Sequence, residues 1–475
     1  MHQTLEMLPF EGAAHLTRDK PRQLCPCRRS PLAAASLSPQ RGPMFTSALP
    51  WRSSSSSPLE FRFKHYAVTP PALPSRTHRK LVLMPDLWYQ FLSQFCAHFY
   101  FSRVEVLPAA PRLSGPTLLV ALHRNGAVDG WVYKSIFPRA TFLIAAQLRQ
   151  NLLAKIFFTG ISVVRDKDEG DRCANAAAMQ LCQKLLATGG VLAIFPEGTS
   201  SLGPRHLPFK SGAARIAHEA WQSNIPLTVI PLGITYDAPS TFRSHVQVIV
   251  GEPLTHISVA ALSLGELKHE LSSRLESLGI NAASDEQYRD IQVLAALVSP
   301  EIPYHQALKS LERSLPTAIQ NGWPALRDSL AGHNLLHADK EPFSPRPILL
   351  TAGVAVLLAP LVLAAALLNA PLLLGAYLAG RRLADASNVI TLWRILIGAP
   401  LLVVWLFGVL FSAFAFNVPT LFHVYLILSA LGLFAYAPWK HSARQSFNAI
   451  RFPTLRLSCL ALRSTLLREL RAHVT

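Results

Sequence analysis

Short apolar runs alternate with helix-like stretches between about residues 117 and 255. Six runs rich in β-branched and apolar residues predict strands at 118–122, 141–145, 161–165, 191–195, 227–236 and 246–250. Between them, 151–160 is amphipathic, and 171–187 has apolar residues at helical spacing before Gly189 and Gly190. Strands that alternate with helices predict an α/β fold, with a mixed sheet flanked by helices.

Long apolar segments dominate the last third of the chain, at 348–379, 395–416 and 421–437. With a rise of about 1.5 Å per residue, each segment reaches about 25 Å or more, which suits a bilayer. A C-terminal transmembrane helical region is therefore expected. Pro360, Asn369 and Pro371 can break the first segment into a hairpin that returns the chain to the side it came from.

The same patterns divide the chain into segments. Residues 1–83 are basic, rich in Ser and Pro, and without apolar periodicity. They are a disordered tail, a transit peptide, or an artefact of a start site upstream of Met84. The expected segments that follow are the α/β domain (84–255), a helical extension (256–345), the transmembrane region (346–440) and a basic amphipathic tail on the membrane surface (441–475). Within the α/β domain, the aromatic stretch 86–101 predicts an interfacial helix or a core helix.

Charge and cysteine usage narrow the possible partners. The chain has 45 Lys and Arg against 28 Asp and Glu, a formal net charge of +17, and a mean hydropathy of +0.26. Basic ends that flank apolar segments favour an anionic membrane surface over nucleic acid. The positive-inside rule puts the basic residues Arg381, Arg382 and Arg394, and the tail after Lys440, in the cytoplasm. The six scattered cysteines indicate neither a disulfide framework nor a zinc site.

The first candidate for chemistry is the segment 122–129, which follows an apolar strand and opens a helix. His123 can act as a general base towards an alcohol, and Asp129 can hold its other nitrogen and stabilise the imidazolium. With 17 histidines in the chain, such a pair also arises by chance. The pair alone does not decide between a catalytic site and an incidental contact.

Candidates for an anion site follow two later strands. Arg165 has a planar guanidinium that suits a phosphate, although it can equally pair with a neighbouring Asp on the surface. Glu197 comes after a buried strand and is expected to hold Arg165 or a substrate hydroxyl. Gly198 lets the backbone approach a ligand closely, and Thr199 offers hydroxyl and N–H donors. Lys210 precedes a helix N-terminus, which also favours an anion, or it is a solvated charge.

These blocks resemble the motifs of the glycerolipid acyltransferase family, which includes lysophosphatidic acid and glycerol-3-phosphate acyltransferases. The matching blocks are HRNGAVD, GISVVR, FPEGTS with LPFKSGAARIA, and VIPLGITY, within about residues 85–255. The resemblance implies an acyltransferase domain over 84–255 in which His123 is the base and Asp129 its partner. It also implies that an acceptor phosphate site is shaped by Arg165, Glu197, Gly198 and Thr199. The family usually has four residues between the His and the Asp, whereas this chain has five.

The activity implied by this resemblance is direct acyl transfer from acyl-CoA or acyl carrier protein to a hydroxyl of glycerol-3-phosphate or 1-acylglycerol-3-phosphate in phospholipid synthesis. No bound cofactor or metal is expected. The implied partners are the thioester donor, the glycerol phosphate acceptor and membrane lipids, with the catalytic domain of an integral membrane protein on the cytoplasmic face. The alternatives are dihydroxyacetone phosphate or a lysophospholipid as acceptor, or a non-catalytic membrane lipid-binding scaffold. The nearly uncharged apolar segments disfavour a transporter.

Overall fold

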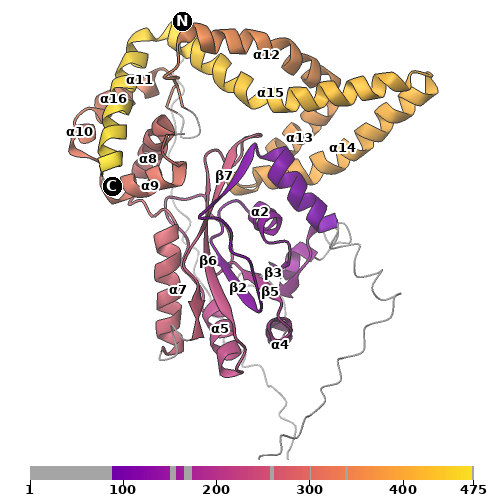
Figure 1. Cartoon of the computed structure of the whole chain (residues 1–475), viewed down its shortest axis with the longest axis vertical. Helices are drawn as coiled ribbons and strands as arrows, with labels where there is room; N and C mark the ends of the chain where they lie inside the picture. Colours follow the sequence, from indigo (N-terminus) through magenta and orange to yellow (C-terminus); the bar gives the residue numbers. More distant parts are fainter. Residues whose placement is uncertain are drawn as a thin grey trace, which may run out of the picture. The chain divides into compact units, whose positions relative to one another are not determined.

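The computed structural model of the chain describes residues 88–149, 157–164, 174–256, 262–299, 301–336 and 341–472. Arg165, the segment 1–83 and most of the predicted helix 151–160 lie outside these ranges. Figure 1 gives the arrangement of the described helices and strands.

Within the described residues, eight strands form one mixed sheet. They are β1 (Arg103–Leu107), β2 (Thr117–Ala121), β3 (Ala140–Ala145), β4 (Ile161–Val163), β5 (Val191–Ile194), β6 (Thr228–Tyr236), β7 (His245–Val250) and β8 (Leu254–Thr255). Their order is β1-β7-β6-β2-β5-β3-β4, and β8 pairs with β6. β7 and β8 run antiparallel to β6, while all other neighbours are parallel. The predicted mixed α/β sheet is confirmed, and β1 and β8 are additional strands.

The alternation of side chains along β2 separates two core layers, one on each face of the sheet. Leu119 and Ala121 pack with η1 and α2 on one face, whereas Leu118 and Val120 pack with α4, α5 and α7 on the other. These covering elements are η1 (Phe95–Tyr100), α2 (Val128–Ile136), α4 (Ala174–Ala187), α5 (Gly212–Gln222) and α7 (Leu264–Leu278). Because both faces of the central strands are buried, the loops at their carboxyl ends start from a rigid edge.

The aromatic stretch around η1 lies against the sheet. Residues 88–94 form a helix that continues directly into η1. Tyr89, Cys96 and Tyr100 belong to the buried core, whereas Phe91 is 47% exposed. Of the two sequence predictions for this stretch, the packing therefore supports the core helix, with an aromatic face left on the outside.

A separate helical core follows the sheet. It consists of α8 (Asp285–Val298), α9 (Tyr304–Arg313), α10 (Thr317–Gln320), α11 (Trp323–Gly332) and the C-terminal α16 (Pro453–Ala472). In α16, Cys459, Leu466 and Leu470 are buried among these helices. The tail was expected to lie on a membrane surface, but this apolar face is covered by protein.

Long apolar helices connect the two ends of this helical core. They are α12 (Ile348–Leu368), α13 (Ala370–Arg382), the short η3 (Ser387–Val389), α14 (Ile390–Ala415) and α15 (Pro419–Arg451). Three of the described segments are long and apolar enough to cross a bilayer, namely Ile348–Leu368, Ser387–Ala415 and Pro419–Arg451. Leu357 and Phe411 are 77% and 75% exposed, as expected for side chains that face lipid. Three candidate membrane-spanning helices thus lie in the expected C-terminal region.

The first apolar segment is divided at Asn369. α12 ends there and α13 begins at Ala370, so Asn369 and Pro371 mark the break, while Pro360 remains inside α12. α12 packs along α15, and α13 packs along α14 (Figure 1). At the break, Asn369 Nδ2 donates to Ser429 Oγ at 2.9 Å, and Tyr425 donates to Asn369 Oδ1 at 2.7 Å. These bonds satisfy the polar side chain among apolar helices.

Candidate active site

His123 and Asp129 meet where β2 gives way to α2. His123 follows the buried end of β2, and Asp129 lies in the first turn of α2. The distance between His123 Nδ1 and Asp129 Oδ2 is 2.9 Å. The turn between them contains Gly126 at a φ of +58°, a conformation that glycine adopts without strain. The five-residue spacing of this chain therefore still brings the carboxylate to the imidazole.

The carboxylate of Asp129 is completely buried and fully hydrogen bonded. Oδ2 accepts the backbone N–H groups of Arg124 at 2.6 Å and Asn125 at 2.8 Å. Oδ1 accepts the hydroxyl of Tyr236 at 2.6 Å. Burial, and then the nearby Asp129 charge, raise the pKa of Tyr236 well above its ordinary value, so this hydroxyl remains a donor. The arrangement fixes an acceptor beside one ring nitrogen of His123.

The imidazole of His123 is held by stacking as well. Its ring lies parallel to Phe195, with centroids 4.2 Å apart and an interplanar angle of 14°. The side chain is 14% exposed. Within the described part of the chain, Nε2 of His123 has no hydrogen-bond partner. A histidine with one nitrogen anchored and the other open can take a proton from a substrate.

Glu197 supports the main chain of the site. It is buried, and its Oε1 accepts the N–H of His123 while its Oε2 accepts the N–H of Leu207, both at 2.8 Å. Burial raises the pKa of Glu197, and the two backbone hydrogen bonds oppose that rise. The sequence predicted that Glu197 holds Arg165 or a substrate hydroxyl. Within the described residues, its two oxygens fix the main chain at His123 and at Leu207, while Arg165 lies outside these residues.

The remaining candidates lie along the loop after β5. Gly198 has a φ of +71°, and a Cβ added there would lie 3.2 Å from Lys210 Nζ. The N–H of Lys210 donates to the carbonyl of Pro196 at 2.9 Å, which brings the Lys210 side chain over this turn. Thr199 continues the turn and is half-buried. Gly198 and Lys210 are thus neighbours, whereas Arg165 lies outside the described residues.

Two site residues were not predicted from the sequence. Tyr236 was assigned to a core strand and not to the His123–Asp129 pair, although a buried tyrosine hydroxyl normally requires a partner. Arg124 is 7% exposed and donates to the carbonyl of Gly203 at 2.7 Å and to the hydroxyl of Tyr288 at 3.3 Å. Its contacts tie the turn after β2 to the loop after β5 and to α8.

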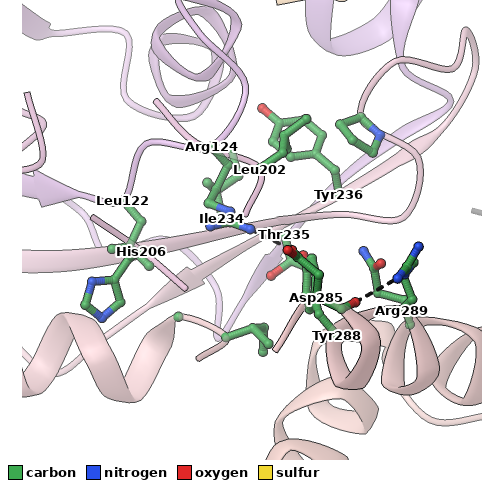
Figure 2. Close-up of a pocket in the computed structure, with 14 residues that line it drawn as sticks. Leu122, Arg124, Leu202, His206, Ile234, Thr235, Tyr236, Asp285, Tyr288 and Arg289 are labelled. Atoms are coloured by element: carbon green, nitrogen blue, oxygen red, sulfur yellow. Dashed lines mark hydrogen bonds between the residues drawn. The ribbon is translucent and has the colours of Figure 1, made fainter. Parts of the chain in front are cut away.

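A pocket of about 420 Å³ opens beside Arg124. Leu122, Ile234 and Tyr236 line it from the sheet, and Tyr288 and Arg289 line it from α8. Figure 2 shows Arg124 and Tyr288 pointing toward one another at its wall. His123 is not among its lining residues, so this pocket adjoins the turn between His123 and Asp129 without containing the imidazole.

Comparisons with known proteins found similarity to acyltransferases. The family model "Acyltransferase" matches residues 98–235. A probable 1-acyl-sn-glycerol-3-phosphate acyltransferase of Mycoplasma pneumoniae is 27% identical over 174 residues, which are 35% of this chain and 61% of that protein. Its counterpart in Mycoplasma genitalium is 30% identical over 121 residues, 24% of this chain and 44% of that protein. The chain thus matches less than two thirds of the length of either relative.

Similarity extends to a solved structure. It is the crystal structure of the 1-acyl-sn-glycerophosphate (LPA) acyltransferase from Thermotoga maritima, with a TM-score of 0.32 and 20% sequence identity. The similarity covers 43% of this chain and 81% of that chain.

Proposed function

We propose that the chain is a membrane-bound O-acyltransferase of the glycerolipid acyltransferase family that acts in phospholipid synthesis, which is supported by the acyltransferase model over residues 98–235 and by the similarity to probable 1-acyl-sn-glycerol-3-phosphate acyltransferases. Its donor is acyl-CoA or an acyl carrier protein thioester, and its acceptor is a hydroxyl of glycerol-3-phosphate or 1-acylglycerol-3-phosphate. The observation that carries the proposal is the 2.9 Å contact between His123 and the buried Asp129, with the other ring nitrogen left open. A non-catalytic scaffold has no need of this arrangement.

The proposed reaction is a direct transfer. His123 Nε2 takes the proton of the acceptor hydroxyl while that oxygen attacks the thioester carbonyl. The new ester C–O bond forms, the C–S bond breaks, and the proton passes from the imidazolium to the leaving thiolate. Asp129 stabilises the transient imidazolium through its bond to Nδ1, and Tyr236 keeps the carboxylate oriented.

The acceptor phosphate is proposed to lie near the loop after β5. Lys210 contributes a positive charge beside Gly198, and Thr199 continues the same turn. Arg165 is proposed to complete the site, since its guanidinium can donate two hydrogen bonds to a phosphate. Glu197 contributes indirectly, because its carboxylate fixes the main chain of His123.

The catalytic domain is proposed to lie on the cytoplasmic side of the membrane. Arg394 near the start of α14 donates to the carbonyl of Ser240, which joins the basic segment to the domain. At the other end, Arg444 of α15 donates to the carbonyl of Glu341 at 2.9 Å, just before α12 begins. Both ends of the α12–α13 pair are therefore tied to the part outside the membrane, which supports a hairpin. The basic residues at these ends favour the cytoplasm.

The experiment that tests this function is acyl transfer by membranes containing the protein, compared with membranes lacking it. Glycerol-3-phosphate and 1-acylglycerol-3-phosphate are offered separately, each with acyl-CoA or an acyl carrier protein donor, and products are identified by mass. Acylation of one of them confirms the proposal and names the acceptor. Dihydroxyacetone phosphate and a lysophospholipid are offered in parallel. Acylation of one of these two alone would show that the acceptor differs from the one proposed, and no product from any of the four acceptors would favour the scaffold.

A further inference from the structure

The start of the α14 membrane segment reaches the loops of the candidate active site. Asn388 of η3 donates through Nδ2 to the carbonyl oxygen of Ser200 at 3.1 Å and to its Oγ at 2.7 Å. A Cβ added to Gly126 would lie 3.0 Å from the carbonyl oxygen of Asn388. One residue thus contacts both the turn after β2 and the loop after β5.

A second set of bonds joins the same elements. The carbonyl of Pro239, in the loop after β6, accepts both Thr391 Oγ1 at 2.6 Å and Asn125 Nδ2 at 3.0 Å. Thr391 and Ile395 of α14 are buried, and Ile395 belongs to the same core layer as α2. The first turns of α14 are therefore packed against the carboxyl-end edge of the sheet.

Asn388 is also connected to the main chain of His123 through the loop after β5. The N–H of Ser201 donates to the carbonyl of His123 at 3.2 Å. Asn388 holds the adjacent Ser200 at two atoms, and its own backbone closes over Gly126. The conformation of the His123–Asp129 turn and of the loop after β5 is thus set partly from the membrane segment.

We propose that Asn388 is a positioning residue for His123, so that the packing of the start of α14 sets the conformation of the turn between His123 and Asp129. Asn388 touches no reacting atom of the proposed reaction, and it acts through Ser200 and Gly126. The inference rests on the proposed function for its kinetic consequences, but it also predicts a structural response that does not need activity. A misplacement of a catalytic group by about 1 Å can cost about a hundredfold in rate. Losing the contacts of Asn388 with Ser200 and Gly126 should therefore lower kcat by about tenfold or more.

The test compares variants of the full chain in membranes or nanodiscs. Asn388→Ala removes the amide, and Asn388→Asp keeps its size but loses the N–H donors. Asn369→Ala is the matched control, because Asn369 also bonds a serine, Ser429, but at the break between α12 and α13. Hydrogen exchange of peptides spanning 122–130 and 196–204 is measured together with Tm, kcat and KM.

The inference predicts faster exchange of both peptides in the two Asn388 variants and unchanged exchange in the Asn369 control. It predicts a lower kcat with little change in KM for the acyl donor, and a combined Asn388→Ala and Ser200→Ala loss smaller than the product of the single losses. Unchanged exchange, or a kcat within about twofold of the Asn369 control at similar Tm, would overturn it. If the native chain transfers no acyl group, the proposed function fails, and the exchange result still decides whether Asn388 positions the turn.

Discussion

Asp129 shows how one buried charge is stabilised by groups from several elements. Its oxygens accept hydrogen bonds from two backbone amides of the turn after β2 and from Tyr236 of β6, besides facing His123. A buried carboxylate is stable only when its lone pairs are used in this way. The same bonds that stabilise the charge also fix the position of the carboxylate relative to the imidazole.

Replacing Tyr236 by Phe tests this interpretation. The variant removes one hydrogen bond to a buried charge, which should cost about 2 kcal/mol in the free energy of unfolding. It should also lower kcat/KM by about tenfold, because the carboxylate that orients His123 becomes less constrained. The measurements are acyl-transfer kinetics and denaturant unfolding of the purified chain.

Tyr133→Phe is the matched control. Tyr133 is equally buried in the same core layer, but its hydroxyl donates to the carbonyl of Leu122 at 3.3 Å and not to Asp129. Equal activity of the two phenylalanine variants would contradict the role assigned to Tyr236.

At the scale of elements, a chain of buried hydrogen bonds, called here the His305 relay, joins the helical core to the sheet. His305 of α9 lies 2.8 Å from Thr235 Oγ1 of β6 through its Nδ1, and its N–H donates to Gln247 Oε1 of β7 at 2.7 Å. Gln247 in turn donates to Glu105 of β1 at 2.8 Å. Three neighbouring strands and one helix are thus connected through side chains in the interior.

This relay predicts a loss of stability in mild acid. Burial, and secondarily the charge of Lys309, lower the pKa of His305 from its ordinary 6.5 to about 4. Between these pH values the unfolded chain binds more protons than the folded one, so stability rises with pH and is lost as pH falls from about 6.5 to 4. At about 1.4 kcal/mol per pKa unit, the contribution is about 3 kcal/mol at most.

Thermal unfolding of the native chain, His305→Gln and His269→Gln across this pH range checks the prediction. His269 lies exposed on α7 and serves as the control. The His305→Gln substitution should flatten the acid slope of Tm, and an unchanged slope would show that His305 is not its source.

Much of the element pattern was predictable because it depends on local sequence. The strands β2 to β7 lie where apolar, β-branched runs occur, and Asn369 and Pro371 break the long apolar segment as expected. The pairing of His123 with Asp129 was also predicted, through the resemblance to known motifs. The partners of Glu197 were not, because they are main-chain N–H groups that carry no residue-specific pattern.

The burial of α16 could not be foreseen for a related reason. Its basic amphipathic pattern suits either a membrane surface or a protein partner. Only the tertiary structure brings α8, α10 and α11 to its apolar face. The role of Asn388 depends likewise on a long-range contact, since Ser200 is 188 residues away in the sequence.

At the scale of the whole molecule, the membrane region begins and ends at the part that carries the site. η3 and the start of α14 are joined to the sheet domain through Asn388 and Arg394, and the segment before α12 is joined to α15 through Asn448, which donates to the carbonyl of Pro342. The connection between α14 and α15, around Asn417, joins the C-terminal end of α14 to the N-terminal end of α15. These are the other ends of the two helices from those that carry Arg394 and Asn448. This arrangement predicts which connections face each side of the membrane.

Cysteine labelling tests that topology. In sealed membrane vesicles with the cytoplasmic face outward, a membrane-impermeant maleimide should label Asp385→Cys, in the loop before η3, above the level of the unsubstituted chain, because the basic ends favour the cytoplasm. Asn417→Cys should be labelled only after the vesicles are opened. Labelling of both positions from the same side would contradict the proposed topology.

His123 is proposed as the general base of acyl transfer, and this role is tested by the transfer rate of His123→Ala. The rate is measured beside the native protein in matched membranes, with the acceptor that the native protein uses and with Tm recorded for both. A loss of at least about a hundredfold at an unchanged Tm is expected, since a positioned general base contributes about 10²–10⁴ in rate. Undiminished transfer by His123→Ala would contradict it.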